Sequence, residues 1–154
     1  MIALLQRVKS ASVVVNGECV AHIPQGLLVL LGVEKKDDET SIDRLAEKIL
    51  KYRVFADAED KMNLSVLDIQ GSVLMVPQFT LAADTQKGLR PSFSSAASPE
   101  KGLALFTQLV DIMRLKGESM GHDLPASWLQ TGQFGADMAV ELINDGPVTF
   151  NLTI

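Results

Sequence analysis

The chain has 154 residues, 47% of them hydrophobic and 21% charged, with a formal net charge of −5 at pH 7. These values are typical of one globular domain, spanning 1–154, and the negative charge argues against a non-specific nucleic-acid-binding protein, which is usually basic. A single cysteine, Cys19, excludes an internal disulfide, and no segment approaches the roughly 18 apolar residues of a membrane span, so we expect a cytoplasmic protein with no membrane partner.

The first part of the chain predicts three strands. Alternating and apolar runs predict strands at 2–15 and 18–23. They are joined by Asn16-Gly17, and Asn-Gly between two such runs is the strongest short hairpin signal. The apolar run 26–33 has glycines near both ends, which is typical of a strand buried on both faces.

The spacing of the apolar residues predicts two helices and a strand in the middle of the chain. Apolar residues recur at helical spacing in 40–52, which predicts an amphipathic helix. Segment 71–81 returns to strand character. A second helix is predicted at 98–117, with a serine cap and a proline at its start and Gly117 as its end.

The last part of the chain predicts a loop and two strands. Segment 117–132 is polar, contains Gly and Pro, and is predicted as a loop. Two strands follow, at 136–143 and 147–154, around an Asn-Asp-Gly-Pro sequence that could be a plain hairpin turn. The order β-β-β-α-β-α-β-β predicts a single-domain α+β fold, with two main helices and a mixed or antiparallel sheet or partial barrel.

Common catalytic motifs are missing from the sequence. There is no glycine-rich phosphate loop, and one cysteine cannot form a thiolate metal site. The only histidines are His22, in a predicted strand, and His122, in a predicted loop, and a structural or solvated role is favoured for both. We therefore expect neither a metal nor a cofactor. Two polar stretches remain among apolar residues, 76–94 and 144–147, and their structural alternatives are a solvent-facing strand edge and a hairpin turn.

Together these stretches carry a family resemblance. "PQFTL" at 77–81, followed by "NDGPVT" at 144–149, resembles the paired signatures Ser-Gln-Phe-Thr and Asn-x-Gly-Pro-x-Thr of the D-aminoacyl-tRNA deacylases, first described as D-tyrosyl-tRNA deacylases. One departure is Pro77, where the family has Ser and where a related animal branch with relaxed stereospecificity has Pro. The resemblance extends to "LLQRV" (4–8), "GLLVLLGV" (26–33), "KMNLSV" (61–66), "LAADTQKGLRPSFS" (81–94), "AASP" (96–99) and "TGQFGADM" (131–138).

The resemblance implies an activity and an assembly. Family members hydrolyse the ester that joins a D-amino acid, or achiral glycine, to the 3′ end of tRNA, a proofreading step in translation. They are homodimers in which a cis Gly-Pro pair of one subunit enters the pocket of the other and rejects L-amino acids. On this resemblance Gly146 and Pro147 are the chirality probe, Arg7 holds the probe, and Asn144 belongs to the same motif. A rigid proline ring suits such a probe because it fixes φ.

The catalytic groups implied by the resemblance are largely main-chain groups, assisted by the terminal ribose hydroxyl. Backbone N–H groups at Gln78, Phe79 and Thr80 could stabilise the developing oxyanion. We rank Thr80 as a positioning residue first and a nucleophile second, because no adjacent histidine activates it. Lys87 and Arg90 are the candidates for contacts with tRNA.

Two alternatives stay open at this point. One is an esterase that uses Thr80 as nucleophile and His122 as base. The other is a catalytically silent, dimeric module that holds RNA ends. A His122→Ala variant separates the esterase from the deacylase, and measured deacylation separates either enzyme from the silent module.

Overall fold

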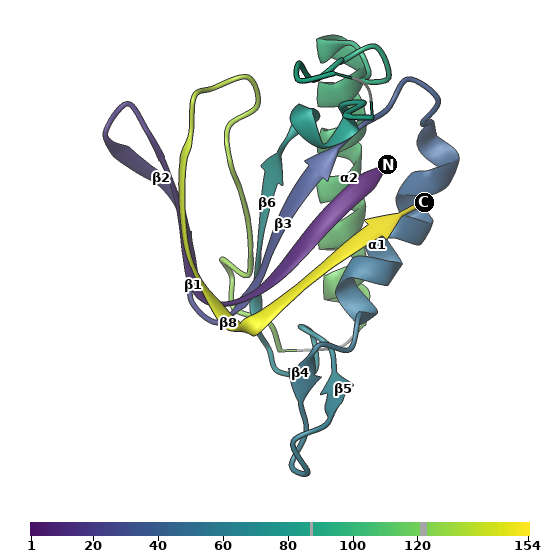
Figure 1. Ribbon diagram of the computed structural model, residues 1–154. Helices are drawn as coiled ribbons and strands as arrows, with labels where there is room; N and C mark the ends of the chain where they lie inside the picture. Colours follow the sequence, from purple (N-terminus) through teal and green to yellow (C-terminus); the bar gives the residue numbers. More distant parts are fainter. Residues whose placement is uncertain (87, 121–122) are drawn as a thin grey trace.

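A mixed, six-stranded sheet carries two helices on one face, as the computed structural model shows for residues 1–86, 88–120 and 123–154 (Figure 1). The strand order is β2-β1-β3-β6-β7, and β8 pairs with the other side of β1. The strands are β1 (Ile2–Val15), β2 (Glu18–Ile23), β3 (Gly26–Gly32), β6 (Ser72–Pro77), β7 (Leu129–Thr131) and β8 (Ala139–Thr153). The predicted α+β fold with two main helices and a mixed sheet is confirmed.

Strand β3 has the buried character that its sequence predicts. It pairs antiparallel with β1 and parallel with β6. Leu27 and Val29 join the hydrophobic cluster on the helical side, whereas Leu28 joins a second cluster on the opposite face. Because successive side chains of a strand point to opposite faces, a continuous apolar run satisfies both clusters.

The two predicted helices are present, with different ends. Helix α1 (Ile42–Lys51) follows a 3₁₀ turn, η1 (Glu39–Ser41), and helix α2 runs over Pro99–Ser119. The Ser98 hydroxyl caps α2 by accepting a hydrogen bond from the Lys101 N–H at 3.3 Å. The predicted end at Gly117 is wrong, because Gly117 lies inside the helix, and a Cβ there would lie 2.5 Å from Cζ2 of Trp128. That glycine provides room for the tryptophan ring.

Three short strands were missing from the sequence-based prediction, and one predicted strand is too long. The predicted strand 71–81 ends at Pro77 and is followed by a 3₁₀ turn, η2 (Phe79–Ala82). The predicted loop 117–132 contains β7, which pairs parallel with β6. Strands β4 (Phe55–Ala56) and β5 (Met62–Leu64) form a small separate hairpin. Strands of two or three residues are too short to leave a period in the sequence.

The predicted pair of C-terminal strands is a single strand. Both halves of β8 pair antiparallel with β1, from Ile2↔Thr153 to Val14↔Ala139. The register shifts between Gln6 and Val8 of β1, where residues 145–148 stand opposite one residue. The Asn-Asp-Gly-Pro sequence is therefore a bulge rather than a hairpin turn, since the chain continues in the same direction after it.

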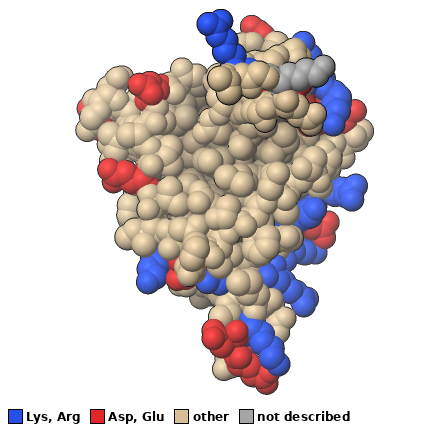
Figure 2. Space-filling view, in the orientation of Figure 1, with Lys and Arg blue, Asp and Glu red and all other residues tan. Residues whose placement is uncertain are grey.

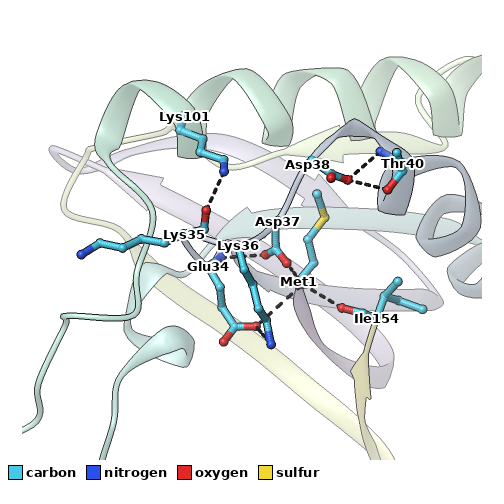
Figure 3. A network of polar contacts seen from close by, with 9 residues as sticks. All are labelled: Met1, Glu34, Lys35, Lys36, Asp37, Asp38, Thr40, Lys101 and Ile154. Carbon is cyan, nitrogen blue, oxygen red and sulfur yellow. Dashed lines mark hydrogen bonds and ion pairs between the residues drawn. The ribbon is translucent and has the colours of Figure 1, made fainter.

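Polar contacts fix the chain ends beside each other (Figure 3). The Met1 ammonium donates to Oδ1 of the buried Asp37 at 2.6 Å and to the Ile154 carbonyl at 3.1 Å. The second carboxylate oxygen of Asp37 accepts from the Glu34 N–H at 2.7 Å. Within the described residues, no helix combines the length and apolar character needed to cross a membrane.

Candidate active site

The Gln78–Thr80 segment lies where β6 leaves the sheet. The Gln78 N–H donates to the Leu31 carbonyl of β3 at 2.7 Å, which fixes the start of the segment. Gly32 follows on β3, and a Cβ at this position would lie 2.8 Å from Cβ of Leu81 and 3.2 Å from the Gln78 carbonyl oxygen. A glycine at position 32 therefore lets η2 pack closely over the end of β3.

The N–H groups of Phe79 and Thr80 are the free donors of this segment. Gln78 uses its own N–H within the sheet, whereas neither of the other two N–H groups bonds to another described residue. This is expected at the start of a helical turn, where the first N–H groups have no partner within the turn. Of the three predicted donors, the geometry thus leaves Phe79 and Thr80 available.

The Thr80 hydroxyl is exposed and bonds to its own segment. It accepts a hydrogen bond from the Gln78 side-chain amide at 2.5 Å. His22, the histidine that the structure describes, makes no hydrogen bond with it, and His122 lies outside the described residues. The hydrogen-bond partner that the described residues give this hydroxyl is therefore an amide, which positions Thr80 but does not activate it as a nucleophile.

A cavity of about 490 Å³ opens beside this segment. It is lined by the ends of β3 and β6, the start of α2 and the segment before β8. Its walls are largely apolar, as is usual for small-molecule pockets. Pro77, Gln78 and Phe79 lie in the wall, so one of the two sequence motifs borders this cavity.

Several lining residues had no predicted role. Phe134, Asp137 and Met138 line the cavity from the segment before β8. Their only signal in the sequence is the resemblance over 131–138, because an irregular segment has no period. At the start of α2, hydrogen bonds from its own backbone N–H and from Ser98 hold the pKa of Glu100 below its usual value, so an anion lies near this rim at neutral pH.

The second motif forms the bulge of β8, and Asn144 fastens it. Oδ1 of Asn144 accepts from the Val148 N–H at 2.7 Å, and Nδ2 donates to the Thr149 hydroxyl at 3.1 Å. The Gly146-Pro147 peptide bond is cis, as the family resemblance implies. Both residues are exposed.

Arg7 holds the bulge from the opposite strand. Its Nε donates to the Asp145 carbonyl at 2.9 Å, and its Nη1 donates to the Val54 carbonyl at 2.6 Å. Arg7 thus contacts the residue just before Gly146, and its role as the holder of the Gly-Pro pair stays a prediction. Arg7 also ties the bulge to the segment that follows α1.

The structure does not bring the two motifs together within one chain. Pro77 pairs with Leu31, which pairs with Ala3, whereas the bulge stands opposite Arg7. Ala3 and Arg7 lie four residues apart on β1, so the end of β6 and the bulge of β8 are separated by about 13 Å along the strand direction. Figure 1 shows the bend of β8 at the lower end of the sheet and the turn that follows β6 at the upper end.

The predicted tRNA contacts lie on the loop after η2. Arg90 is exposed and makes no hydrogen bond or ion pair with another described residue. Lys87 lies outside the described residues. The described residues contain no group of three or more His, Cys, Asp and Glu side chains that could hold a metal ion.

Charged side chains are scarce on one face of the molecule. The middle of the face in Figure 2, which lies inside the bend of β8 in Figure 1, is almost free of them. Ile143 of β8 is 57% exposed. A surface of this kind is typical of a contact with another macromolecule.

Comparisons with known proteins agree over the whole chain. The model of the family described as D-Tyr-tRNA(Tyr) deacylase matches residues 4–153. A D-aminoacyl-tRNA deacylase of Shewanella sp. (strain MR-4) is 53% identical over 154 residues, with 100% of both chains covered. The D-aminoacyl-tRNA deacylase of Shewanella amazonensis (strain ATCC BAA-1098 / SB2B) is 55% identical over the same span, again with 100% of both chains covered.

Two solved structures share the fold. One, titled "c-Myc DNA Unwinding Element Binding Protein", has a TM-score of 0.91 and 36% identity and covers 100% of this chain and 99% of its own. The other, a probable eukaryotic D-amino acid tRNA deacylase, has a TM-score of 0.82 and 19% identity and covers 99% of this chain and 98% of its own. At 19% identity the second supports the fold alone.

Proposed function

This chain belongs to the D-Tyr-tRNA(Tyr) deacylase family, and from this membership we infer that it is a D-aminoacyl-tRNA deacylase, a hydrolase of the ester between a D-amino acid and tRNA. The observation that carries the inference is the cavity of about 490 Å³ bordered by the Gln78-Phe79 part of the first motif. We propose that an aminoacyl ester binds there with its carbonyl next to the free N–H groups of that motif.

The proposed reaction uses main-chain groups. Water adds to the ester carbonyl carbon, and the resulting oxyanion accepts hydrogen bonds from the N–H groups of Phe79 and Thr80. Collapse of this intermediate breaks the bond to the ribose oxygen, which leaves with one proton of the water, while the second proton passes to solvent and the amino acid departs as a carboxylate. Preformed donors of this kind contribute several kcal/mol each in acyl transfer. Gln78 and Thr80 hold the segment through their side-chain hydrogen bond.

We propose that the active enzyme is a homodimer in which the Gly146-Pro147 bulge enters the partner's cavity. The bulge is exposed and stands about 13 Å from the level of its own Pro77, and an almost uncharged face is available for pairing (Figure 2). A wall built from main chain and a proline ring excludes an L side chain but leaves room for hydrogen. Glycine lacks a side chain, so glycyl-tRNA is also expected to be cleaved.

The remaining roles belong to the same proposal. Arg7 and Asn144 hold the bulge in place, and Arg90 and Lys87 contact the 3′ end of aminoacyl-tRNA. The enzyme needs neither metal nor cofactor and works in the cytoplasm.

The decisive experiment is deacylation of matched D- and L-aminoacyl-tRNA by the purified protein. We expect hydrolysis of the D ester and much slower hydrolysis of the L ester. Binding without hydrolysis would instead indicate a silent RNA-end-binding module. A large loss of activity in His122→Ala would indicate the Thr80/His122 esterase.

A further inference from the structure

Two phenylalanines stand side by side on the surface next to the cavity. Phe79 is 62% exposed and Phe93 is 41% exposed. Their ring centroids lie 5.2 Å apart, with the rings tilted by 53°. Phe79 also lines the cavity, whereas Phe93 lies outside it. Aromatic side chains usually bury most of their surface, so an exposed pair at the mouth of a cavity indicates a binding site for another molecule.

The pair is held in place by the loop that carries Phe93. Backbone hydrogen bonds in both directions join Asp84 and Ser92, at 2.8 and 3.0 Å, and close the base of this loop. The Ser95 hydroxyl donates to the Ala82 carbonyl of η2. The Ser95 carbonyl accepts from the Lys35 N–H at 2.9 Å. The two rings therefore form a preformed surface.

Exposed cations lie on the segments next to the pair, as does the exposed Asp84. Lys35 and Arg90 are exposed, and neither forms an ion pair with a carboxylate in the described part of the chain. The Lys101 ammonium donates to the Lys35 carbonyl at 2.7 Å, which brings a third cation to the same end of the molecule (Figure 3). In the proposed dimer a second copy brings its Gly146-Pro147 bulge into the cavity, whereas RNA brings phosphates, which these cations attract. Charge complementarity therefore favours RNA.

We propose that Phe79 and Phe93 form a stacking platform for the single-stranded nucleotides that precede the terminal aminoacyl nucleotide of tRNA. This inference rests on the proposed function, because the terminal nucleotide occupies the cavity. Phe79 is shared by the cavity wall and the platform, so a strand leaving the cavity passes over the pair. Aromatic rings beside cations are the usual elements of a surface that binds single-stranded RNA.

The test compares two esters that differ only in the RNA. The first is D-aminoacyl-adenosine, which fills the cavity alone. The second is the same D-amino acid on an RNA hairpin with a single-stranded CCA 3′ end. In Phe93→Ala, the kcat/KM of the hairpin relative to that of the adenosine ester should fall at least about fivefold, because loss of one base stack costs roughly 1 kcal/mol or more. Phe93→Tyr should restore the ratio.

A matched control and a charge variant complete the design. Leu115 is 63% exposed on α2, and Leu115→Ala should leave the ratio unchanged. Lys35→Gln should make binding of the hairpin less sensitive to salt, since fewer phosphates are neutralised. Fluorescence anisotropy of a labelled hairpin that carries no amino acid measures binding without any hydrolysis. The platform is therefore tested even if the wild type cleaves neither ester.

Three results would overturn the platform. One is an equal change of both esters in Phe93→Ala, and another is unchanged hairpin binding in that variant. The third is conversion of Phe93→Ala from dimer to monomer, which would show that a second copy covers the rings. If the wild type hydrolysed neither ester but Phe93→Ala still bound the hairpin more weakly than the wild type, the proposed reaction would be refuted and the platform supported.

Discussion

Arg7 and Asp145 meet through one nitrogen. Nε of Arg7 donates to the Asp145 carbonyl at 2.9 Å and lies 3.5 Å from the carboxylate oxygen Oδ2 of the same residue. The other arm of the guanidinium reaches the Val54 carbonyl at 2.6 Å. One side chain thus spans two segments that lie far apart in the sequence, and a single change at position 7 releases both.

Arg7→Ala should weaken discrimination between D and L substrates. A hydrogen bond to a charged group contributes roughly 1.5–3 kcal/mol, so the loosened bulge should raise the L-to-D ratio of kcat/KM by about tenfold. Deacylation of matched D- and L-aminoacyl-tRNA measures this ratio. Arg7→Lys should resemble Arg7→Ala, because one ammonium cannot span both carbonyls. Asp145→Asn keeps the carbonyl contact and should change the ratio much less. An unchanged ratio in Arg7→Ala would refute this role.

Gly146→Ala should lower activity on every substrate. Gly146 has φ 145°, and an added Cβ would lie 2.6 Å from Cγ2 of Val148 and 2.9 Å from its nitrogen. The bulge must shift to relieve roughly 1–3 kcal/mol of strain, and displacement of a positioning group costs about tenfold or more in rate. Gly17→Ala is the control, because Gly17 also has positive φ, 79°, but has nothing within 4 Å of the added Cβ. Equal kinetics for the two variants would contradict the assignment.

Displacement of the Gln78–Thr80 backbone should be worse than loss of the Thr80 hydroxyl. Thr80→Ala removes one hydrogen bond, worth about 1 kcal/mol, and should retain activity within about tenfold of wild type. Gly32→Ala pushes on Leu81 and the Gln78 carbonyl, and loss of an oxyanion donor costs roughly 10²–10³ in kcat. Single-turnover kinetics on D-aminoacyl-tRNA distinguish the two, with circular dichroism as the check on folding. An acyl-enzyme trapped on Thr80 would make Thr80 the nucleophile.

Mixing two defective variants should restore activity if each site is shared between subunits. Gly32→Ala damages the cavity and keeps the bulge, whereas Gly146→Ala does the reverse. After subunit exchange, up to about a quarter of the sites combine an intact cavity with an intact bulge, because a two-fold dimer pairs the same surfaces of both subunits. Sedimentation confirms the dimer, and deacylation measures the recovery. Activity that remains the average of the two separate variants would place both motifs in one subunit.

Asp37→Asn should destabilise the fold strongly. The carboxylate is 4% exposed and binds the Met1 ammonium and the Glu34 N–H. Breaking a buried pair costs up to about 3–5 kcal/mol, and the Glu34 carboxylate, 3.9 Å from the ammonium, offsets part of this cost. Urea unfolding measures the loss. The neighbouring Asp38→Asn is the control, since Asp38 is exposed and Asn caps a helical turn equally well. A similar free energy of unfolding for both variants would contradict the prediction.

The sequence predicts the long helices and strands because their hydrophobic periods are regular. Its predictions are wrong where the same residue type fits two different structures. Gly117 resembles a helix end but makes room for Trp128, which no local pattern can reveal. The Asn-Asp-Gly-Pro sequence has turn chemistry, and only its pairing with β1 on both sides shows a bulge. The motif residues were identifiable through family resemblance. Phe134 and Met138 lie in the resembling segment 131–138 but received no role, because an irregular segment becomes a cavity wall only after folding.

Main-chain groups supply the contacts at both motifs: the free N–H groups of η2, and the carbonyls of Asp145 and Val54 that Arg7 binds. This has a genetic consequence. In a saturation screen for loss of function, substitutions of polar side chains at these positions should mostly survive. Inactive alleles should concentrate where the backbone itself is constrained, at Gly32, Gly146 and Pro147. A lineage could therefore change many surface residues around the pocket while those few positions stayed fixed.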